Sequence, residues 1–292
     1  MHTSREFVRK PRSLNEIMRW KATEFGQFLL YTGPVVLHDI PPEQLFQNFL
    51  LFCVGITLLV SPHYCQQYCD YAGELLTVCV KNMRTLYGEE MLVYNVHGLI
   101  HLANDVQRFG ALDNFSAFPF ENQLKCIKQL VRKPNFPLQQ VTKRLAEKQR
   151  FGKQTYTALQ SNIETKKEHC IGPLPSDMCS TSVKQYAQLH YNGMVVSVSS
   201  GDNCVSLSNS KPCIIRNIIT CDDKILLVVE HFQDCSSFFD TPLPSQHLSI
   251  YKARLLSGTY VVVSVDDVAG KCVCLPLSRD YCVILPLLHG QL

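Results

Sequence analysis

Two histidines and one glutamate are the residues of this sequence whose types and spacing suggest chemistry. His97 and His101 are four residues apart, so a helix would place both imidazoles on one face, one turn apart. That spacing suits two ligands of one tetrahedral zinc ion. Glu121 follows Pro119 in the first turn of another expected helix, where the helix dipole stabilises a carboxylate that can face a divalent cation. Taken alone, the same residues also fit two hydrogen-bonded helix histidines and an ordinary N-terminal helix acid.

A strongly basic stretch surrounds Glu121. Between Phe118 and Lys153 there are nine Lys and Arg residues but only two acids, Glu121 and Glu147. Such helices suit the phosphate backbone of a nucleic acid, although a solvated helix face has the same composition. On the helix expected from 118, three of the bases recur at i, i+3 and i+7. The candidate nucleic-acid-binding residues are Lys125, Lys128, Arg132, Lys133, Lys143, Arg144 and Lys148.

The elements that must position these residues are predicted to be helices. Apolar residues recur at helical spacing over 14–31, where Gly33-Pro34 is expected to stop the helix. Further helices are predicted over 42–60, from 61 to about 86, and over 93–109, 118–132 and 138–150. The sequence therefore predicts an all-α region over residues 1–153.

The pattern changes after a polar stretch, 154–182, which is predicted to be a linker. From Val183 onward, short runs rich in Val, Ile and Leu alternate with turn residues, which is typical of a small β-barrel or β-sandwich. Residues 183–292 are thus predicted to form a β-rich domain, and the fold class is α+β. Charge divides in the same way, because residues 1–170 carry a net +5 and residues 171–292 a net −2.

Composition narrows the cellular setting. The 14 cysteines include no C-x-x-C pair, and the first 12 residues are polar and basic with no apolar segment after them. We therefore expect reduced thiols, no signal peptide, and a location in the nucleus or cytoplasm. The apolar segment 45–60 is shorter than the roughly 20 residues that cross a bilayer, so we expect a buried core helix and no membrane.

Four motifs, in order, carry a resemblance to a known family. Lys21-Ala22 is followed by an aromatic-rich segment, Phe25 to Leu37, that ends in Pro-Val-Val-Leu. A long helical run leads to His97-Gly98-Leu99-Ile100-His101-Leu102, and Pro119-Phe120-Glu121 follows, with Glu121 20 residues after His101. This stretch, about residues 5–150, resembles the C-terminal part of CACTA (En/Spm-like) DDE transposases, including their transposase-associated domain of unknown function. It is more loosely similar to the catalytic subunit of the V(D)J recombinase.

The resemblance implies a fold and a site. In such enzymes an RNase H-like fold holds two aspartates and a glutamate, and two Mg²⁺ ions bound there align a nucleophile for attack on a phosphodiester. A helical insertion separates the second aspartate from the glutamate. By this comparison, residues 14–110 are similar to the later part of the insertion domain, and residues 118–150 are similar to the closing helices of the RNase H-like fold. Glu121 would be the third catalytic acid, and His97 and His101 would be half of a zinc site.

The sequence departs from the family in ways that limit this reading. No sheet bearing two aspartates is predicted before Leu14, and no C-x-x-C pair completes the zinc site. We therefore expect Glu121 to be vestigial, and neither Mg²⁺ nor Zn²⁺ to be held by this chain alone. Three hypotheses remain: a transposase fragment without autonomous catalysis, a non-catalytic nucleic-acid- or chromatin-binding module, and a nuclease completed in trans by a chain carrying the two aspartates. The expected partners are DNA, a second copy of the chain, or the missing transposase half.

Overall fold

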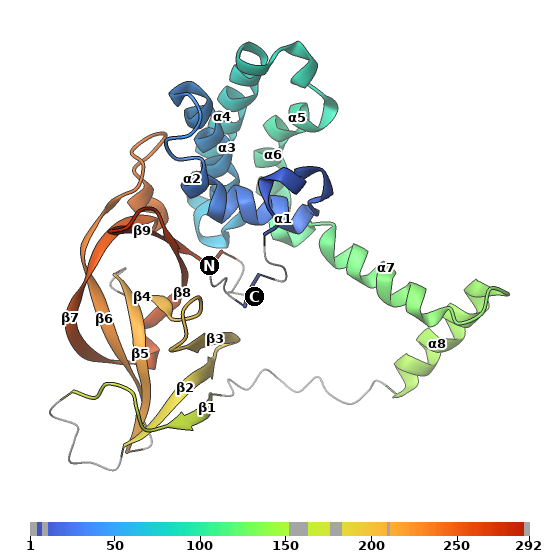
Figure 1. Cartoon of the computed structure of the whole chain (residues 1–292). Helices are drawn as coiled ribbons and strands as arrows, with labels where there is room; N and C mark the ends of the chain where they lie inside the picture. Colours follow the sequence, from blue (N-terminus) through green and yellow to red (C-terminus); the bar gives the residue numbers. More distant parts are fainter. Residues whose placement is uncertain are drawn as a thin grey trace.

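The helices come first along the chain and antiparallel strands follow (Figure 1), so the predicted α+β fold class is confirmed. The computed structural model describes residues 5–7, 11–151, 163–175, 183–208, 211–222 and 224–288. The helices are α1 (Ala22–Gln27), α2 (Gly33–Val36), α3 (Glu43–Val60), α4 (Pro62–Tyr87), α5 (Tyr94–Gly98), α6 (Leu102–Phe109), α7 (Phe118–Leu130) and α8 (Pro137–Phe151).

Two long helices, α3 and α4, form the centre of the helical region. Ser61 separates them, and its hydroxyl accepts a hydrogen bond from the Tyr64 backbone N–H at 3.4 Å, which caps α4. The two helices pack closely because Gly55 has no side chain: a Cβ there would lie 2.9 Å from Cδ2 of Leu76. Leu58 of α3 and Leu76 are both fully buried. This packing orients the shorter helices that follow.

The single helix predicted over 14–31 is wrong in detail. A 3-10 helix (Leu14–Arg19) ends at the extended residue Trp20, and α1 then continues through a π-helical turn (Phe28–Thr32) into α2. Gly33 was expected to stop the helix but lies inside it. A Cβ on Gly33 would lie 2.7 Å from Cζ of Phe49, so the glycine permits close packing instead.

The strands form one antiparallel sheet that closes on itself. Strand β5 pairs along one edge with β6 and along the other with β4 and then β2, and the order β4–β8–β9–β7–β6 completes the ring. A bulge between Ile215 and Asn217 lets β5 bend between its partners. The strands are β1 (Glu164–His169), β2 (Lys184–Tyr191), β3 (Met194–Ser197), β4 (Cys204–Leu207), β5 (Pro212–Cys221), β6 (Lys224–Ser237), β7 (Tyr251–Ser264), β8 (Val268–Pro276) and β9 (Tyr281–Pro286).

One hydrophobic core joins the helices to the strands. Leu58 and Leu76 belong to the same cluster of buried residues as Leu248, Val283 and Leu285. A second cluster fills the barrel around Ile215, Ile218 and Leu227. The predicted boundary near residue 183 therefore does not separate two independent cores.

The N-terminal segment also ties the two parts together. Arg5 and Glu6 form ion pairs with Asp202 and Lys271, while the ring of Phe7 lies 5.1 Å from that of Tyr31. The Tyr31 hydroxyl in turn accepts a hydrogen bond from the Leu288 N–H at 3.0 Å. Residues from both ends of the described chain thus meet at Tyr31, between the helices and the barrel.

Two further expectations concern residues 154–182 and 45–60. The predicted linker is in part a strand, because β1 (Glu164–His169) pairs with β2; residues 154–162 and 176–182 lie outside the described ranges. Helix α3 is long and apolar enough to cross a membrane, but 56% of it is buried inside the protein, as in a core helix. The absence of a membrane partner stays a prediction.

Candidate nucleic-acid interface

Helices α7 and α8 form a two-helix arm, residues 118–151, that projects from the rest of the molecule (Figure 1). Phe118 begins α7, and its backbone N–H donates to the hydroxyl of Ser116 at 3.3 Å. The arm turns back at residues 131–136. There, the Gln140 side-chain carbonyl accepts from the N–H groups of Arg132 and Lys133 at 3.0 and 3.2 Å, and its amide donates to the carbonyl oxygen of Lys133 at 2.9 Å. One glutamine therefore fixes the turn that orients α8 against α7.

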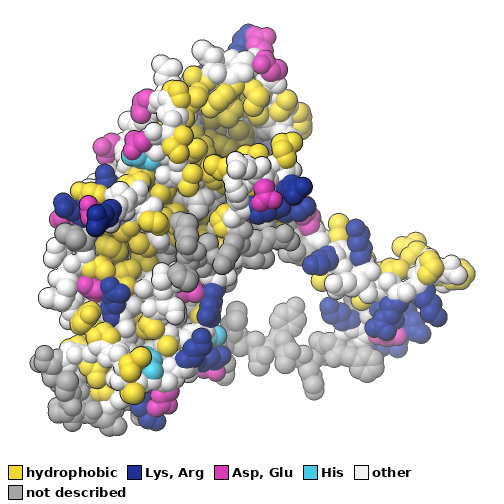
Figure 2. Space-filling model, in the orientation of Figure 1, with side chains coloured by type: hydrophobic (Ala, Val, Ile, Leu, Met, Phe, Trp, Pro, Cys, Tyr) yellow, Lys and Arg dark blue, Asp and Glu magenta, His cyan; other side chains and the backbone are white. Residues whose placement is uncertain are grey.

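The basic residues predicted to bind nucleic acid all lie on this arm. Figure 2 shows their dark blue side chains gathered along it, and six of the seven are exposed, Arg144 being half-buried. Lys125 and Lys128 are i, i+3 neighbours on α7. The helix predicted over 118–132 ends at Leu130, because Val131 is extended, so Arg132 lies in the turn after α7 and not at the predicted i+7 position of the helix. An exposed row of cations of this kind can contact successive phosphates of a nucleic-acid backbone.

The arm also exposes apolar side chains, which were not singled out in the sequence. Phe120, Leu124, Phe136 and Leu138 are between 58% and 81% exposed. Side chains of this size seldom stay in water over a whole helix pair, because helices normally bury one apolar face. The signal was available as apolar residues at helical spacing, but only the structure shows that the rest of the described chain leaves them uncovered.

Glu121 lies in the first turn of α7, with its side chain exposed. Its backbone N–H donates to the carbonyl oxygen of Ala117 at 3.0 Å. The helix has no side-chain N-cap, because residue 117 is alanine, so the carboxylate is the charged group nearest the positive end of the helix dipole. Glu121 is thus accessible, at the point where the arm leaves the body of the molecule.

The histidine pair lies side by side, although the helix that carries it is divided. His97 belongs to α5 and His101 to a 3-10 turn (Leu99–His101) before α6. Their Nε2 atoms are 3.4 Å apart, their ring centroids are 5.2 Å apart, and both side chains are exposed. Two imidazoles so placed can share one ion, but they supply two of the four ligands of a tetrahedral zinc site.

Within the described ranges, no further ligands gather at the histidine pair. Among the described residues, no group of three or more His, Cys, Asp or Glu side chains could hold a metal ion. The closely spaced Cys65 and Cys69 are buried in the helical core, where the Cys69 thiol contacts the Ala103 carbonyl oxygen at 3.2 Å. Asp70 is occupied by Gln107, whose amide donates to it at 2.7 Å. The described residues therefore offer an accessible acid and a basic arm rather than a metal centre.

Comparison with known proteins adds information for the β-rich part only. A family model described as a domain of unknown function (DUF8592) matches residues 168–287, from the end of β1 to just after β9. Neither a curated protein nor a solved structure matches the chain. The barrel is thus similar to a recurring domain whose role is not defined, and the helical region, with the arm and the histidine pair, lies outside the match.

Proposed function

We propose that the chain is derived from the C-terminal part of a CACTA-class DDE transposase and binds DNA through the α7–α8 arm without catalysing strand transfer on its own. The single observation that carries the proposal is the exposed row of cations on the arm, in which Lys125 and Lys128 are neighbours on α7 and Arg132 follows in the turn after it. Charges in such a row gain affinity by releasing counterions from a nucleic acid. The resemblance of Pro119-Phe120-Glu121 and of the histidine pair to the transposase motifs supports the choice of DNA.

The proposal treats Glu121 as a vestigial third acid. Two Mg²⁺ ions require several oxygen ligands, and the described residues place no other carboxylate with Glu121 in a group that could hold a metal ion. The same reasoning applies to His97 and His101, which supply two ligands where zinc needs four. For this chain alone, we therefore propose a binding role that needs neither Mg²⁺ nor Zn²⁺.

A salt series tests DNA binding directly. The anisotropy of a labelled duplex is measured with the wild type and with the double variant Lys125→Glu/Lys128→Glu. We expect the wild-type affinity to fall steeply with salt, and the variant to bind more weakly, with a log–log slope smaller by about 1 for each lysine that contacts a phosphate. The matched control is Lys81→Glu/Lys224→Glu, which reverses two exposed lysines outside the arm. Equal losses in both variants, or a wild-type affinity without a salt slope, would contradict the proposal.

The trans-completed nuclease is the alternative that Glu121 itself favours, because its carboxylate is exposed and accessible to a partner chain. Mg²⁺-dependent nicking by the purified chain, abolished by Glu121→Gln, would establish catalysis and refute the binding-only proposal. A chromatin-binding module would instead bind nucleosomes more tightly than the bare duplex, and Glu121→Gln would leave that preference unchanged.

A further inference from the structure

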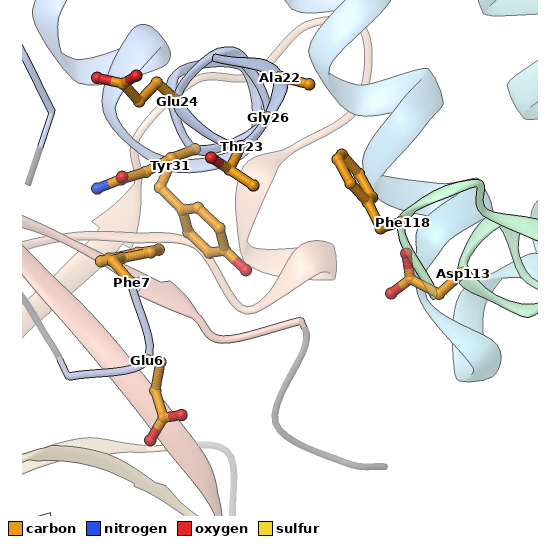
Figure 3. A pocket seen from close by; sticks show the side chains of 10 residues that line it. Glu6, Phe7, Ala22, Thr23, Glu24, Gly26, Tyr31, Asp113 and Phe118 are labelled. Carbon is orange, nitrogen blue, oxygen red and sulfur yellow. The ribbon is translucent and has the colours of Figure 1, made fainter. Parts of the chain in front are cut away.

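A small pocket lies at the root of the arm, where α7 begins, and we call it the root pocket. Its volume is about 240 Å³. That is less than the roughly 300–1,000 Å³ of pockets for drug-sized ligands, so its occupant is smaller, such as one ring system. Its walls come from four separate segments, lined by Glu6, Phe7, Ala22, Thr23, Glu24, Gly26, Gln27, Tyr31, Asp113 and Phe118. Figure 3 shows Phe118 and Asp113 on one side of the space, and Tyr31 with Phe7 on the other.

The walls are mostly apolar, and the aromatic ring most open to a ligand is that of Phe118, since Phe7 is half-buried. Phe118 is 45% exposed, whereas Tyr31 is 1% exposed and its ring is covered by Phe7, 5.1 Å away in an edge-on contact. A cation such as a methylated ammonium is usually held by several ring faces around it. The lining does not surround a ligand with open ring faces, and the more exposed face of Phe118 favours a flat ring that stacks on it.

The polar atoms of the root pocket call for a ligand that both accepts and donates hydrogen bonds. Gln27 is buried, at 7% exposed, and its side-chain amide nitrogen has no hydrogen-bond partner. Leaving such a donor unpaired is unfavourable, so it favours an acceptor on the ligand, which an ammonium group does not have. The carboxylates on the lining favour a donor. Glu24 and Glu6 are already paired with Arg12 and Lys271, which leaves little net charge from these two acids.

The position of the root pocket suggests where such a ring comes from. Phe118 is the first residue of α7 and lies one turn before the accessible Glu121. Lys125 and Lys128 lie further along the same helix, and Arg132 lies in the turn after it. A strand whose phosphates contacted Lys125 and Lys128 and that continued toward the start of α7 would bring its next nucleotide to the pocket. Unpaired bases stacked on aromatic side chains are a general means of binding single-stranded nucleic acid.

We propose that the root pocket binds one nucleobase that carries an exocyclic amino group, unpaired from a DNA strand that lies along the α7–α8 arm. The ring stacks on Phe118, accepts a hydrogen bond from the Gln27 amide, and donates from its amino group to a carboxylate on the lining. The strand as the source of the base rests on the proposed DNA binding, whereas the preference for the ring rests on the pocket alone.

Gly26 offers a way to fill the root pocket without disturbing the fold. It lies in α1, and a Cβ built on it meets no atom within 4 Å, so a leucine side chain there enters open space. Leucine also has a higher helix propensity than glycine. Gly98 in α5 is the matched control, because a Cβ there also meets nothing within 4 Å and the residue lies outside the pocket. Circular dichroism checks that Gly26→Leu and Gly98→Leu both stay folded.

The probes are a duplex with one unpaired 2-aminopurine nucleotide, the fully paired duplex, and free 2-aminopurine riboside. We expect the wild type to quench the unpaired base and to bind that duplex roughly fivefold or more tightly than the paired one, the size of one stacking contact. Gly26→Leu is expected to lose the quenching and the preference while keeping its affinity for the paired duplex. Gly98→Leu is expected to behave as the wild type. An unpaired thymine, which has no amino group, is expected to give a smaller preference.

Each of the other outcomes of these binding experiments contradicts a specific part of the proposal. Binding to paired DNA with no preference for the unpaired base refutes the root pocket and leaves the proposed function standing. If neither duplex binds but the free riboside does, and Gly26→Leu abolishes riboside binding, then the pocket binds a nucleobase ring as proposed. In that case the DNA strand as the source of the base and the proposed function are both wrong. A trimethyl-lysine peptide that binds in a Gly26→Leu-sensitive manner, where the riboside does not, refutes the nucleobase.

Discussion

Replacing Lys271 by methionine should detach the N-terminal segment from the barrel. The Lys271 side chain is 2% exposed, and its Nζ donates to Asp202 at 2.7 Å, to the Val195 carbonyl oxygen at 2.8 Å and to Glu6 at 3.2 Å. Methionine keeps most of the apolar stem but removes the charge and all three hydrogen bonds. The buried carboxylate of Asp202 then loses Lys271 but keeps Arg5, whose Nε lies 3.3 Å away.

The expected magnitude follows from these contacts. Breaking a buried ion pair by removing one partner costs about 3–5 kcal/mol, because the other charge stays buried without its partner. The remaining contact of Asp202 with Arg5 reduces this loss, whereas the unpaired Val195 carbonyl adds to it by about 1 kcal/mol or more. We therefore expect Lys271→Met to lower the free energy of unfolding by about 3 kcal/mol.

Urea unfolding followed by circular dichroism measures this loss, and hydrogen exchange at the Arg5 amide, which donates to Asp202 at 3.1 Å, reports release of the segment. The control is Lys224→Met at an exposed lysine, where the change should stay within about 0.5 kcal/mol. The double variant Lys271→Met/Asp202→Asn should lose less than the sum of the single losses, since the two groups interact directly. We call the ion pairs of Arg5, Glu6, Asp202 and Lys271 the ion cluster. Additive losses, or a Lys271→Met effect no larger than that of the control, would show that the ion cluster does not hold residues 5–7 on the barrel.

Three further predictions concern acid stability, the shared core and zinc. Hydrogen bonds from Arg12 and then from the Lys21 backbone lower the pKa of Glu24 to about 2, so its contribution to stability should be complete above about pH 4.5 and disappear as the pH falls toward 2. In an acid titration the stability gap between wild type and Glu24→Gln should therefore narrow over this range, and a gap independent of pH would contradict the assignment. Leu58→Ala should cost about 2–5 kcal/mol and lower the hydrogen-exchange protection of both α4 and β9, because one core joins them; unchanged protection in β9 would argue against that coupling. Elemental analysis should find less than one zinc ion per chain, since His97 and His101 supply only two ligands, and one tightly bound ion per chain would refute this.

The fold could be predicted from the sequence where local patterns decide the structure. Helical periodicity placed α3, α4, α7 and α8 within a few residues, and the runs of β-branched residues marked the strands. The prediction failed where tertiary contacts override local signals. Gly33-Pro34 has the composition of a helix stop, yet the helix continues there, and Phe49 packs where a side chain on Gly33 would lie. Strand β1, with the polar sequence ETKKEH, has no apolar alternation and is a strand only because β2 pairs with it.

The candidate sites also differ in whether local sequence spacing or tertiary contacts create them. The histidine pair depends on a spacing of four residues and the Lys125–Lys128 pair on a spacing of three, and helical geometry makes both pairs neighbours. The i+7 position predicted for Arg132 fails because α7 ends at Leu130, and the roles of these residues stay predictions. The root pocket depends instead on bringing Phe7, Gln27, Asp113 and Phe118 together from four segments, and no local spacing encodes that contact. Its walls are set by the ion cluster that holds residues 5–7 on the barrel and by the core that positions α1. If the two proposals hold, loosening Lys271 should weaken the proposed recognition of an unpaired base while leaving the salt dependence expected from Lys125 and Lys128, and this outcome would distinguish a built pocket from a merely basic surface.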